Sequence, residues 1–427
     1  MFSAGKQVTE KQVTEKQITG KQVTRPQVTT VTGKGIKMDF RLTEEQRMIA
    51  ETAEQVGNRF GLDYWREIDA EKQFPTEMWK AICEAGLCGV ALPEEHGGAG
   101  LGMLEMALII EKLSASGAGS TIGQVFMLNP IFGGVAISQF GTPDMKKNLL
   151  PRLMSGDLNF CMALTEPDAG TNTLEIRSFA EENDAGWRLN GRKIWITGVG
   201  TAEKMLVVAR TKKVTEVSSR SDGLSMFMID VARRGLEHTP IDKVGTNTLA
   251  SSTVFFDDVQ VEPHELIGTL HSGWRQLLDV LNTERIVTTA GLTGMSDLAI
   301  KLAVNYGNDR KIFGGRPISA YQGLQFPLAQ CFAENEAARL LNYKAAVQFD
   351  QGLPYSSEAN AGKLLAAQVA SKVTERAMQT MGGMGYSKEY HVERLWRDCR
   401  LFKFAPISEE MILNYIAMHD LGMPKSY

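Results

Sequence analysis

Two threonines flank a short polar loop in the middle of the chain, at residues 163–172 (Ala-Leu-Thr-Glu-Pro-Asp-Ala-Gly-Thr-Asn). The hydroxyls of Thr165 and Thr171 can both donate and accept hydrogen bonds. Pro167 restricts the backbone between them, and Gly170 permits conformations that other residues avoid. Such a loop can present both hydroxyls to a ligand with backbone groups close by. From these residues alone, an ordinary surface loop is the better supported interpretation.

The composition is ordinary for a globular protein. The 427 residues are 43% hydrophobic and 22% charged, and the formal net charge is −4. A chain of this length accommodates two or three domains. The small net charge gives no indication of a nucleic-acid or anionic-membrane partner. The most apolar stretch, residues 125–137, is interrupted by Asn129 and Pro130 and is too short to span a bilayer.

Cysteine and histidine residues are scattered along the chain. There are five cysteines and six histidines, and neither set has the spacing of metal ligands. An odd number of dispersed cysteines favours free thiols in a reducing cytoplasm. We therefore predict a cytoplasmic protein without a metal site.

Residues 1–37 differ in sequence pattern from the rest of the chain. A Lys-Gln-Val-Thr-Glu unit recurs with a period of five and then degrades. This period fits neither a heptad nor a strand, so we predict a disordered, low-complexity tail, or a start placed too early with Met38 as the natural beginning. The segment lacks the apolar core of a signal peptide and the arginine content of a transit peptide.

Hydrophobic spacing divides the remainder into three domains of an α+β protein. Residues 38–157 form an all-helical domain that begins at a capping box of Thr43 and Gln46, with further helices over 75–86, 103–113 and 144–154. Residues 158–272 form a β domain, a small barrel or sandwich, with strands at 204–210, 224–231 and 252–261. In this domain Asn190-Gly191 is a strong signal for a hairpin turn. Residues 273–427 form a bundle of four or five helices that includes a long helix over 361–381.

Three further features have ordinary explanations when each is taken alone. Trp195 on an alternating strand is by default a core aromatic, and Arg310 is by default a solvated charge. The glycine cluster at 382–385 follows a predicted long helix rather than a strand, so it is not a dinucleotide-binding fingerprint.

The order of domains and four motifs together resemble the acyl-CoA dehydrogenase family over residues 38–427. The motifs are Thr-Glu-Pro-x-Ala-Gly-Thr at 165–171, Asn-Gly-Arg-Lys-Ile-Trp-Ile-Thr at 190–197, a segment from Arg310 to Gln322 that begins Arg-Lys-Ile-Phe-Gly, and a carboxy-terminal signature from Gln379 to Asp398. One motif alone would be weak, but four in the family's order are specific. The resemblance implies a helical domain, a middle β domain and a four-helix-bundle-type domain.

The resemblance also implies an activity and its partners. The enzyme would use FAD to dehydrogenate an acyl-CoA thioester to the trans-2-enoyl-CoA. A carboxylate would remove the α-proton while the β-hydride passes to the flavin. Electrons would then go to an electron-transfer flavoprotein. A homotetramer is expected, with a dimer as the minimum.

Cofactor contacts follow from the resemblance residue by residue. Trp195 would lie along the flavin ring, and the hydroxyls of Thr165 and Thr197 would bond its polar edge. The Arg310 guanidinium of a neighbouring subunit would pair with the pyrophosphate. Gly382 and Gly383 would let backbone amides approach the cofactor. The remaining implied contacts are Thr171, Phe313, Gln322, Gln379, Ser408 and Glu410.

The catalytic base departs from the usual family pattern. Counting from Asp398, the common glutamate position falls on Pro406. Isovaleryl- and long-chain-type members carry the base before an arginine on another helix, which here is Glu284 before Arg285. We therefore expect Glu284 to be the base and Arg285 to contact the substrate. Without the resemblance, Glu284 would be interpreted as an exposed helix charge. Glu409 and Glu410 are rivals because they follow Pro406 closely.

Pro406 also affects the thioester site. The family holds the thioester oxygen with the backbone N–H at this position, and proline has none. Losing one such donor typically costs about 3 kcal/mol in the transition state. Either the Ile407 amide replaces it, or the chemistry differs. The alternatives are an enoyl-CoA reductase of the crotonobetainyl-CoA reductase type, a flavin oxidase or monooxygenase, and a non-catalytic flavin or acyl-CoA binder.

Overall fold

Helices dominate the amino-terminal part of the computed structural model, which describes residues 41–425. The predicted tail at 1–37 and the proposed start at Met38 lie outside these residues. Thr43 accepts the Gln46 N–H at 3.1 Å, and the Gln46 side chain accepts the Thr43 N–H at 3.0 Å, so the predicted capping box is confirmed. The helices are α1 (Glu44–Asn58), α2 (Leu62–Glu71), α3 (Thr76–Glu84), α4 (Met103–Leu113), α5 (Thr121–Phe126), α6 (Ala136–Phe140) and α7 (Pro143–Met154).

Helices α3, α4 and α7 correspond to the three helices that apolar spacing predicts after α1. Helix α2 has no counterpart among the predictions, although Trp65 and Ile68 on it are buried. Their spacing of three residues is a helical signal that could have located this helix.

The most apolar segment is longer than the sequence indicates. Helical backbone runs from Thr121 to Phe140, through a π-helical stretch (Met127–Val135) that contains Pro130. Among the described residues, this run alone has the length and composition to cross a membrane, but 89% of its most apolar window is buried inside the protein. The Asn129 side chain accepts the Phe160 N–H at 2.8 Å and so joins the run to the β domain. The segment is therefore placed as a core helix.

The middle of the chain forms one hydrogen-bonded sheet. Its strand order is β6-β7-β3-β2-β4-β5-β8, with β1 added in parallel to β4, and the hydrogen bonds leave β6 and β8 at the two ends. The predicted β domain is confirmed; β6 was not predicted. The strands are β1 (Phe160–Ala163), β2 (Phe179–Asn183), β3 (Gly186–Thr197), β4 (Lys204–Arg210), β5 (Leu224–Asp230), β6 (Leu236–Pro240), β7 (Ser251–Val261) and β8 (Leu266–Ile267).

The predicted turn at Asn190-Gly191 is wrong. Both residues lie inside the continuous strand β3, and the hairpin turn lies between β2 and β3. The pairing of β3 with β7 shifts register between Leu189 and Gly191, where Gly191 has φ +150°. A bulge uses the freedom of glycine in the same way as a turn does, so the dipeptide did not distinguish them.

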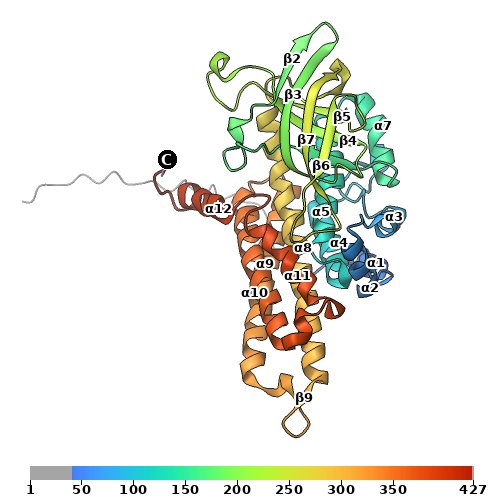
Figure 1. The fold of residues 1–427 in the computed structure, drawn as a ribbon, viewed down its shortest axis with the longest axis vertical. Helices are drawn as coiled ribbons and strands as arrows, with labels where there is room; N and C mark the ends of the chain where they lie inside the picture. Colours follow the sequence, from blue (N-terminus) through green and yellow to red (C-terminus); the bar gives the residue numbers. More distant parts are fainter. Residues whose placement is uncertain (1–40, 426–427) are drawn as a thin grey trace, which may run out of the picture. The chain divides into compact units, whose positions relative to one another are not determined.

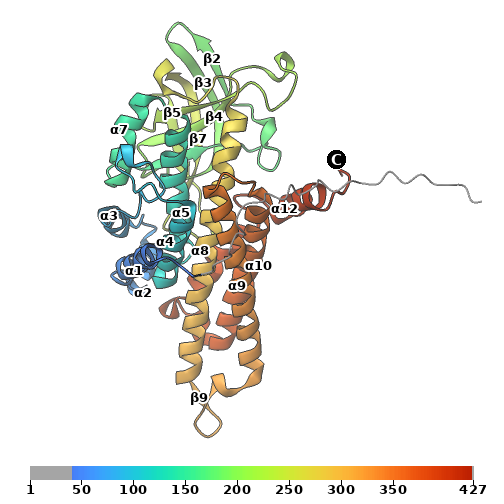
Figure 2. The same cartoon turned by 180° about the vertical axis from the view of Figure 1, so that it is seen from behind.

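The carboxy-terminal part is the predicted bundle. Figures 1 and 2 show α8, α9 and α10 side by side, and each contacts the other two. A two-strand hairpin of β9 (Lys311–Ile312) and β10 (Arg316–Pro317) joins α8 to α9. The helices are α8 (Gly273–Asp309), α9 (Gln322–Asp350), α10 (Ser356–Met381), α11 (Val392–Cys399) and α12 (Glu409–Tyr415).

Helix α8 is the central element because it belongs to both helical parts. It contacts α4 and α5 from the first part and α9 and α10 from the bundle. As a result, every residue from 283 to 296 is buried, polar side chains included. Hydroxyls on this stretch bond the helix's own carbonyls, as Thr289 does to Arg285 O at 2.7 Å. A carboxylate on this segment is therefore held away from bulk water.

Candidate active site

The loop that carries Thr165 is tied to strand β3. The Ile194 N–H donates to Thr165 O at 2.9 Å, and Glu166 and Ala169 close a tight turn through two backbone hydrogen bonds. Thr165 is half-buried and Thr171 is exposed. Within residues 41–425, neither threonine hydroxyl has a hydrogen-bond partner. Both are therefore available to a ligand.

A buried ion pair anchors this loop. Lys193 is fully buried, and its Nζ lies 2.9 Å from Glu166 Oε1. It also donates to Leu164 O at 2.9 Å and to Val208 O at 2.7 Å. Burial lowers the pKa of Lys193 to about 8, although Glu166 opposes that shift. Burial alone would raise the pKa of Glu166, but the charge of Lys193, together with hydrogen bonds donated by the N–H groups of Arg177 and Ser178, makes the net shift downward. Both groups are charged at neutral pH.

Trp195 is not the core aromatic that its strand position suggests. The β3–β7 register shifts again between Lys193 and Ile196, and Trp195 has φ +61°. This irregularity turns the indole outward, so that the residue is 54% exposed. A tryptophan in the left-handed region is strained and is a functional candidate. Two residues on, the Thr197 hydroxyl lies 3.0 Å from Ser251 Oγ.

Glu284 lies on the buried stretch of α8 and is only 4% exposed. Burial raises its pKa to about 7, while Arg285 and Lys363 act in the opposite direction. Its carboxylate makes no hydrogen bond or ion pair with any described residue. Arg285 donates to the Asn282 side chain, and its Nε is buried without a partner. The side chain of Glu284 is thus a buried carboxyl group that is free to accept a proton, and not an exposed helix charge.

The loop that contains Pro406 is held by a second buried lysine. Lys363 on α10 donates from Nζ to Phe402 O at 2.7 Å and to Ile407 O at 2.6 Å. Ser408 accepts the Met411 N–H at 3.3 Å and so caps α12. Glu410 on α12 is exposed, and Glu409 lies 3.5 Å from Lys403.

The other predicted cofactor residues lie at the far end of the bundle. They are exposed: Arg310, Phe313, Gln322, Gln379, Gly382 and Gly383. Phe313 sits in the β9–β10 turn with φ +42° and is 87% exposed. Gly382 ends α10 with φ +59°, and no other atom occupies the place of its missing Cβ. The Tyr306 and Tyr390 rings, 5.8 Å apart, show that this end of α8 meets the segment between α10 and α11.

The structure therefore separates the predicted site into two groups. Glu284 lies on α8 and Arg310 directly follows its last residue, so the two are separated by roughly 39 Å at 1.5 Å per residue. Lys363 and Gly382 on α10 are separated by roughly 28 Å on the same measure. One chain brings Glu284, Arg285 and the Ile407 loop to one end of the bundle, and the exposed group of Arg310 and Gly382 to the other.

Sequence reasoning assigned no role to Lys193, Glu166 or Lys363. Lys193 alternates with exposed Arg192 on β3, which places it on the inward face of the strand. Lys363 shares a helix face with Ala359, Ala366 and Ala370, all of them buried. In both cases, a lysine on the inward or apolar face of its element is a sequence signal that could have identified the residue.

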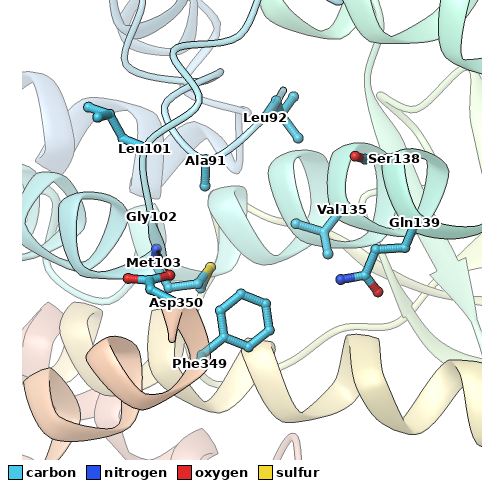
Figure 3. A pocket seen from close by; sticks show the side chains of 10 residues that line it. All are labelled: Ala91, Leu92, Leu101, Gly102, Met103, Val135, Ser138, Gln139, Phe349 and Asp350. Carbon is cyan, nitrogen blue, oxygen red and sulfur yellow. Dashed lines mark hydrogen bonds between the residues drawn. The ribbon is translucent and has the colours of Figure 1, made fainter. Parts of the chain in front are cut away.

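A small hollow lies apart from this site (Figure 3). It encloses about 100 Å³ between α4, α6 and the end of α9. Asp350 fills one side and accepts the N–H groups of Met103 at 2.7 Å and Leu104 at 3.2 Å. None of the predicted site residues lines it. Over residues 41–425, no group of three histidine, cysteine or acidic side chains could hold a metal ion.

Family models match nearly all of the described chain. The acyl-CoA dehydrogenase N-terminal domain matches residues 43–157, the middle domain residues 161–259 and the C-terminal domain residues 271–420. Among curated proteins, the chain is 36% identical to acyl-CoA dehydrogenase FadE12 of Mycobacterium tuberculosis, over 90% of this chain and 97% of that protein. It is 31% identical to 3-(aryl)acrylate reductase of Clostridium sporogenes, over 89% and 99%.

Solved structures share the whole fold. A chain from work on the electron transferring flavoprotein of Acidaminococcus fermentans superimposes with a TM-score of 0.85 at 32% identity, over 90% of this chain and 100% of that one. A glutaryl-CoA dehydrogenase of Mycobacterium smegmatis in complex with FADH2 gives 0.83 at 25% identity, over 90% and 96%. The predicted α+β architecture is confirmed, and the chain belongs to the acyl-CoA dehydrogenase family of FAD-dependent oxidoreductases that act on acyl-CoA thioesters.

Proposed function

We propose that this enzyme dehydrogenates an acyl-CoA thioester to the trans-2-enoyl-CoA, with Glu284 as the base. The observation that carries the proposal is a buried carboxyl group without a hydrogen-bond partner among the described residues, whose pKa is raised by burial to about 7. A general base works best when its pKa lies near the working pH, and an unbonded carboxylate is free to accept a proton. Glu409, the nearest rival, lies within ion-pair distance of Lys403.

The residues of this chain fit FAD. Trp195 exposes a large aromatic face from a strained position, and the hydroxyls of Thr165 and Thr171 have no partner within residues 41–425. The exposed Arg310 offers a guanidinium to a pyrophosphate, and the open backbone at Gly382 permits close approach. FAD, when bound, supplies the acceptor for the hydride that leaves the substrate β-carbon.

The thioester oxygen needs a donor other than residue 406. Pro406 has no N–H, and the Ile407 N–H donates to no group in the described part of the chain. We assign the Ile407 N–H as the replacement donor, since a donor aimed at the developing enolate oxygen stabilises the transition state. Arg285, next to Glu284, borders the same site.

We also propose that the cofactor site is completed by a second subunit. The two groups of site residues, separated by roughly 39 Å along α8, cannot both reach one flavin within a chain. Exposed apolar side chains on α9, with Phe326 at 61%, Phe332 at 54% and Leu340 at 50% exposure, support self-association. We expect a homotetramer, with a dimer as the minimum.

The electron acceptor is proposed to be an electron-transfer flavoprotein. The structural similarity to a chain studied with such a flavoprotein supports this choice. A cytoplasmic location is proposed as well, because all five cysteines are buried and unpaired. The similarity to a 3-(aryl)acrylate reductase favours enoyl-CoA reduction as the second candidate.

Anaerobic mixing of the FAD-loaded enzyme with a panel of saturated acyl-CoA esters tests this function. A dehydrogenase bleaches the flavin absorbance with at least one ester. A spectral shift without bleaching by any ester would indicate a binder and contradict the proposal. Reoxidation of pre-reduced enzyme by enoyl-CoA esters, without bleaching by their saturated forms, would favour the reductase.

A further inference from the structure

We propose that Lys363 is a positioning residue for proton abstraction, which holds the Pro406 loop by its two ends and whose charge acts on Glu284. This inference rests on the proposed function, since it gives Lys363 a role only if Glu284 is the base. It adds a residue to which the sequence motifs assigned no role.

Lys363 holds both ends of the loop that contains Pro406. Lys363 is fully buried on α10, and its Nζ donates to Phe402 O and Ile407 O. These two carbonyls bracket the segment that contains Pro406 and the Ile407 N–H. Because both ends are fixed to one ammonium group, the segment from Phe402 to Ile407 cannot drift without breaking a charge-assisted hydrogen bond. The clamp thus supports the donor that replaces the missing N–H.

The charge of Lys363 is the second feature that carries the proposal. No carboxylate of the described chain lies within ion-pair distance of Lys363 Nζ, so its charge is not cancelled by an adjacent partner. The charged and titratable groups that act on Lys363, Glu284 and Arg285 come from three places in the fold. They are Glu284 and Arg285 on α8, Tyr355 before α10, and Glu409, Glu410 and Tyr415 on α12.

The charge of Lys363 favours the ionised form of Glu284. A cation in a buried site lowers the pKa of a nearby carboxyl group, and Lys363 acts on Glu284 in this direction against the larger effect of burial. Burial lowers the pKa of Lys363 itself to about 8. Both groups are therefore charged between about pH 7 and pH 8, which is the state in which Glu284 can accept a proton.

A purely structural lysine is the competing explanation. It would stabilise the loop without any effect on the titration of Glu284. Three substitutions separate these roles. Lys363→Met keeps the length but removes donors and charge, Lys363→Gln keeps donors without charge, and Lys363→Arg keeps both. Lys372→Met is a matched control, since Lys372 lies on the same helix and pairs with Glu334 at 2.7 Å.

The test measures the rate constant of flavin reduction by a saturating acyl-CoA as a function of pH. The holoenzyme should show a rising limb near pH 7. In Lys363→Met and Lys363→Gln this limb should move up by about one pH unit, which lowers the rate about tenfold at pH 6. Lys363→Arg and Lys372→Met should keep the limb at its original position.

Hydrogen–deuterium exchange of the same holoenzymes reports the clamp independently of activity. The amides of Phe404 and Ala405, which both donate to Leu401 O, should exchange faster in Lys363→Met than in the wild type or in Lys372→Met, and Lys363→Gln should restore part of the protection. If Lys363→Met does not fold, Lys363→Gln decides the question, because it still satisfies buried carbonyls.

An unchanged limb in Lys363→Gln, or a limb displaced equally in Lys363→Arg, would overturn the inference. Failure of the proposed function looks different: Glu284→Gln would then reduce flavin at the native rate. A slow Glu284→Gln together with an unshifted Lys363→Gln would leave the base in place and remove only the role of Lys363.

Discussion

Two fully buried lysines support the two sides of the candidate site in different ways. Lys193 in the β domain lies 2.9 Å from the Glu166 carboxylate, whereas the hydrogen-bond partners of Lys363 within residues 41–425 are two carbonyls at 2.7 Å and 2.6 Å. Burial lowers the pKa of each to about 8. Burial thus has the same effect on the pKa in both places, and it is opposed by a local ion pair in one and by more distant carboxylates in the other.

The difference shows what each lysine can do. Glu166 neutralises Lys193, so this pair serves to fix the Thr165 loop against β3. Lys363 has no adjacent counter-ion among the described residues, so its charge remains effective at Glu284. A paired buried charge stabilises geometry, whereas an unpaired one also tunes a neighbour.

Breaking the ion pair should have the largest effect on stability. Lys193→Met leaves Glu166 buried without its partner, which typically costs about 3–5 kcal/mol, and it also leaves the carbonyls of Leu164 and Val208 without this donor. Lys363→Met leaves two carbonyls unbonded, which costs about 1–3 kcal/mol for each unsatisfied group. Urea unfolding of both holoenzymes measures the difference. An equal or greater loss in Lys363→Met would show that the comparison is wrong.

Arg310 is a third cation of the proposed site, and unlike Lys193 and Lys363 it lies on the surface. It is exposed in this chain, and its proposed partner belongs to the flavin of another subunit. Arg310→Ala should therefore release FAD and loosen assembly while leaving the fold of the chain intact. Absorbance and sizing chromatography measure both effects, with Lys301→Ala on the exposed face of α8 as the control. A monomer that retains stoichiometric FAD would rule out the shared site.

The pH dependence of flavin reduction tests the charge state of Glu284, on which the unpaired Lys363 acts. Burial raises the pKa of Glu284 to about 7, and only the carboxylate form can accept a proton. The rate should therefore fall about tenfold per pH unit below pH 7 and level off above it. Stopped-flow measurements from pH 5.5 to 8.5 at saturating acyl-CoA check this. A rate that is flat or falls as pH rises through 7 would contradict the assignment.

The smallest effect is expected from the amino-terminal segment. Deleting residues 2–37 should leave flavin content and turnover unchanged, because their sequence pattern cannot bury a core. Both quantities can be compared directly with those of the full chain. A large loss in either would mean that the segment takes part in the working enzyme.

Periodicity and capping signals predicted much of this fold because they are local. The Thr43 cap and helix α4 (Met103–Leu113) follow from side-chain spacing alone. The Asn190-Gly191 prediction failed because a bulge and a turn make the same demand on the backbone, and only the partner strand β7 distinguishes them.

The candidate site also combines features that could be predicted from the sequence with features that could not. The family resemblance alone selected Glu284 as the candidate base, and its burial depends on helices that are distant in the sequence and pack around α8. Lys363 contacts carbonyls about 40 residues away, which no local pattern encodes. The separation of Arg310 from Glu284 along α8 becomes evident only once the helix is known to be continuous.

The most direct test of the account is the rate of flavin reduction in Glu284→Gln, with Glu409→Gln as the matched control. Glutamine preserves the size of the side chain and removes the basic lone pair, so FAD and acyl-CoA binding should stay nearly intact. We predict that Glu284→Gln lowers the anaerobic reduction rate by about two to four orders of magnitude, the usual contribution of a general base. Glu409→Gln should remain within a few fold of the wild type. A native rate in Glu284→Gln with a collapsed rate in Glu409→Gln would place the base on α12 and contradict the account.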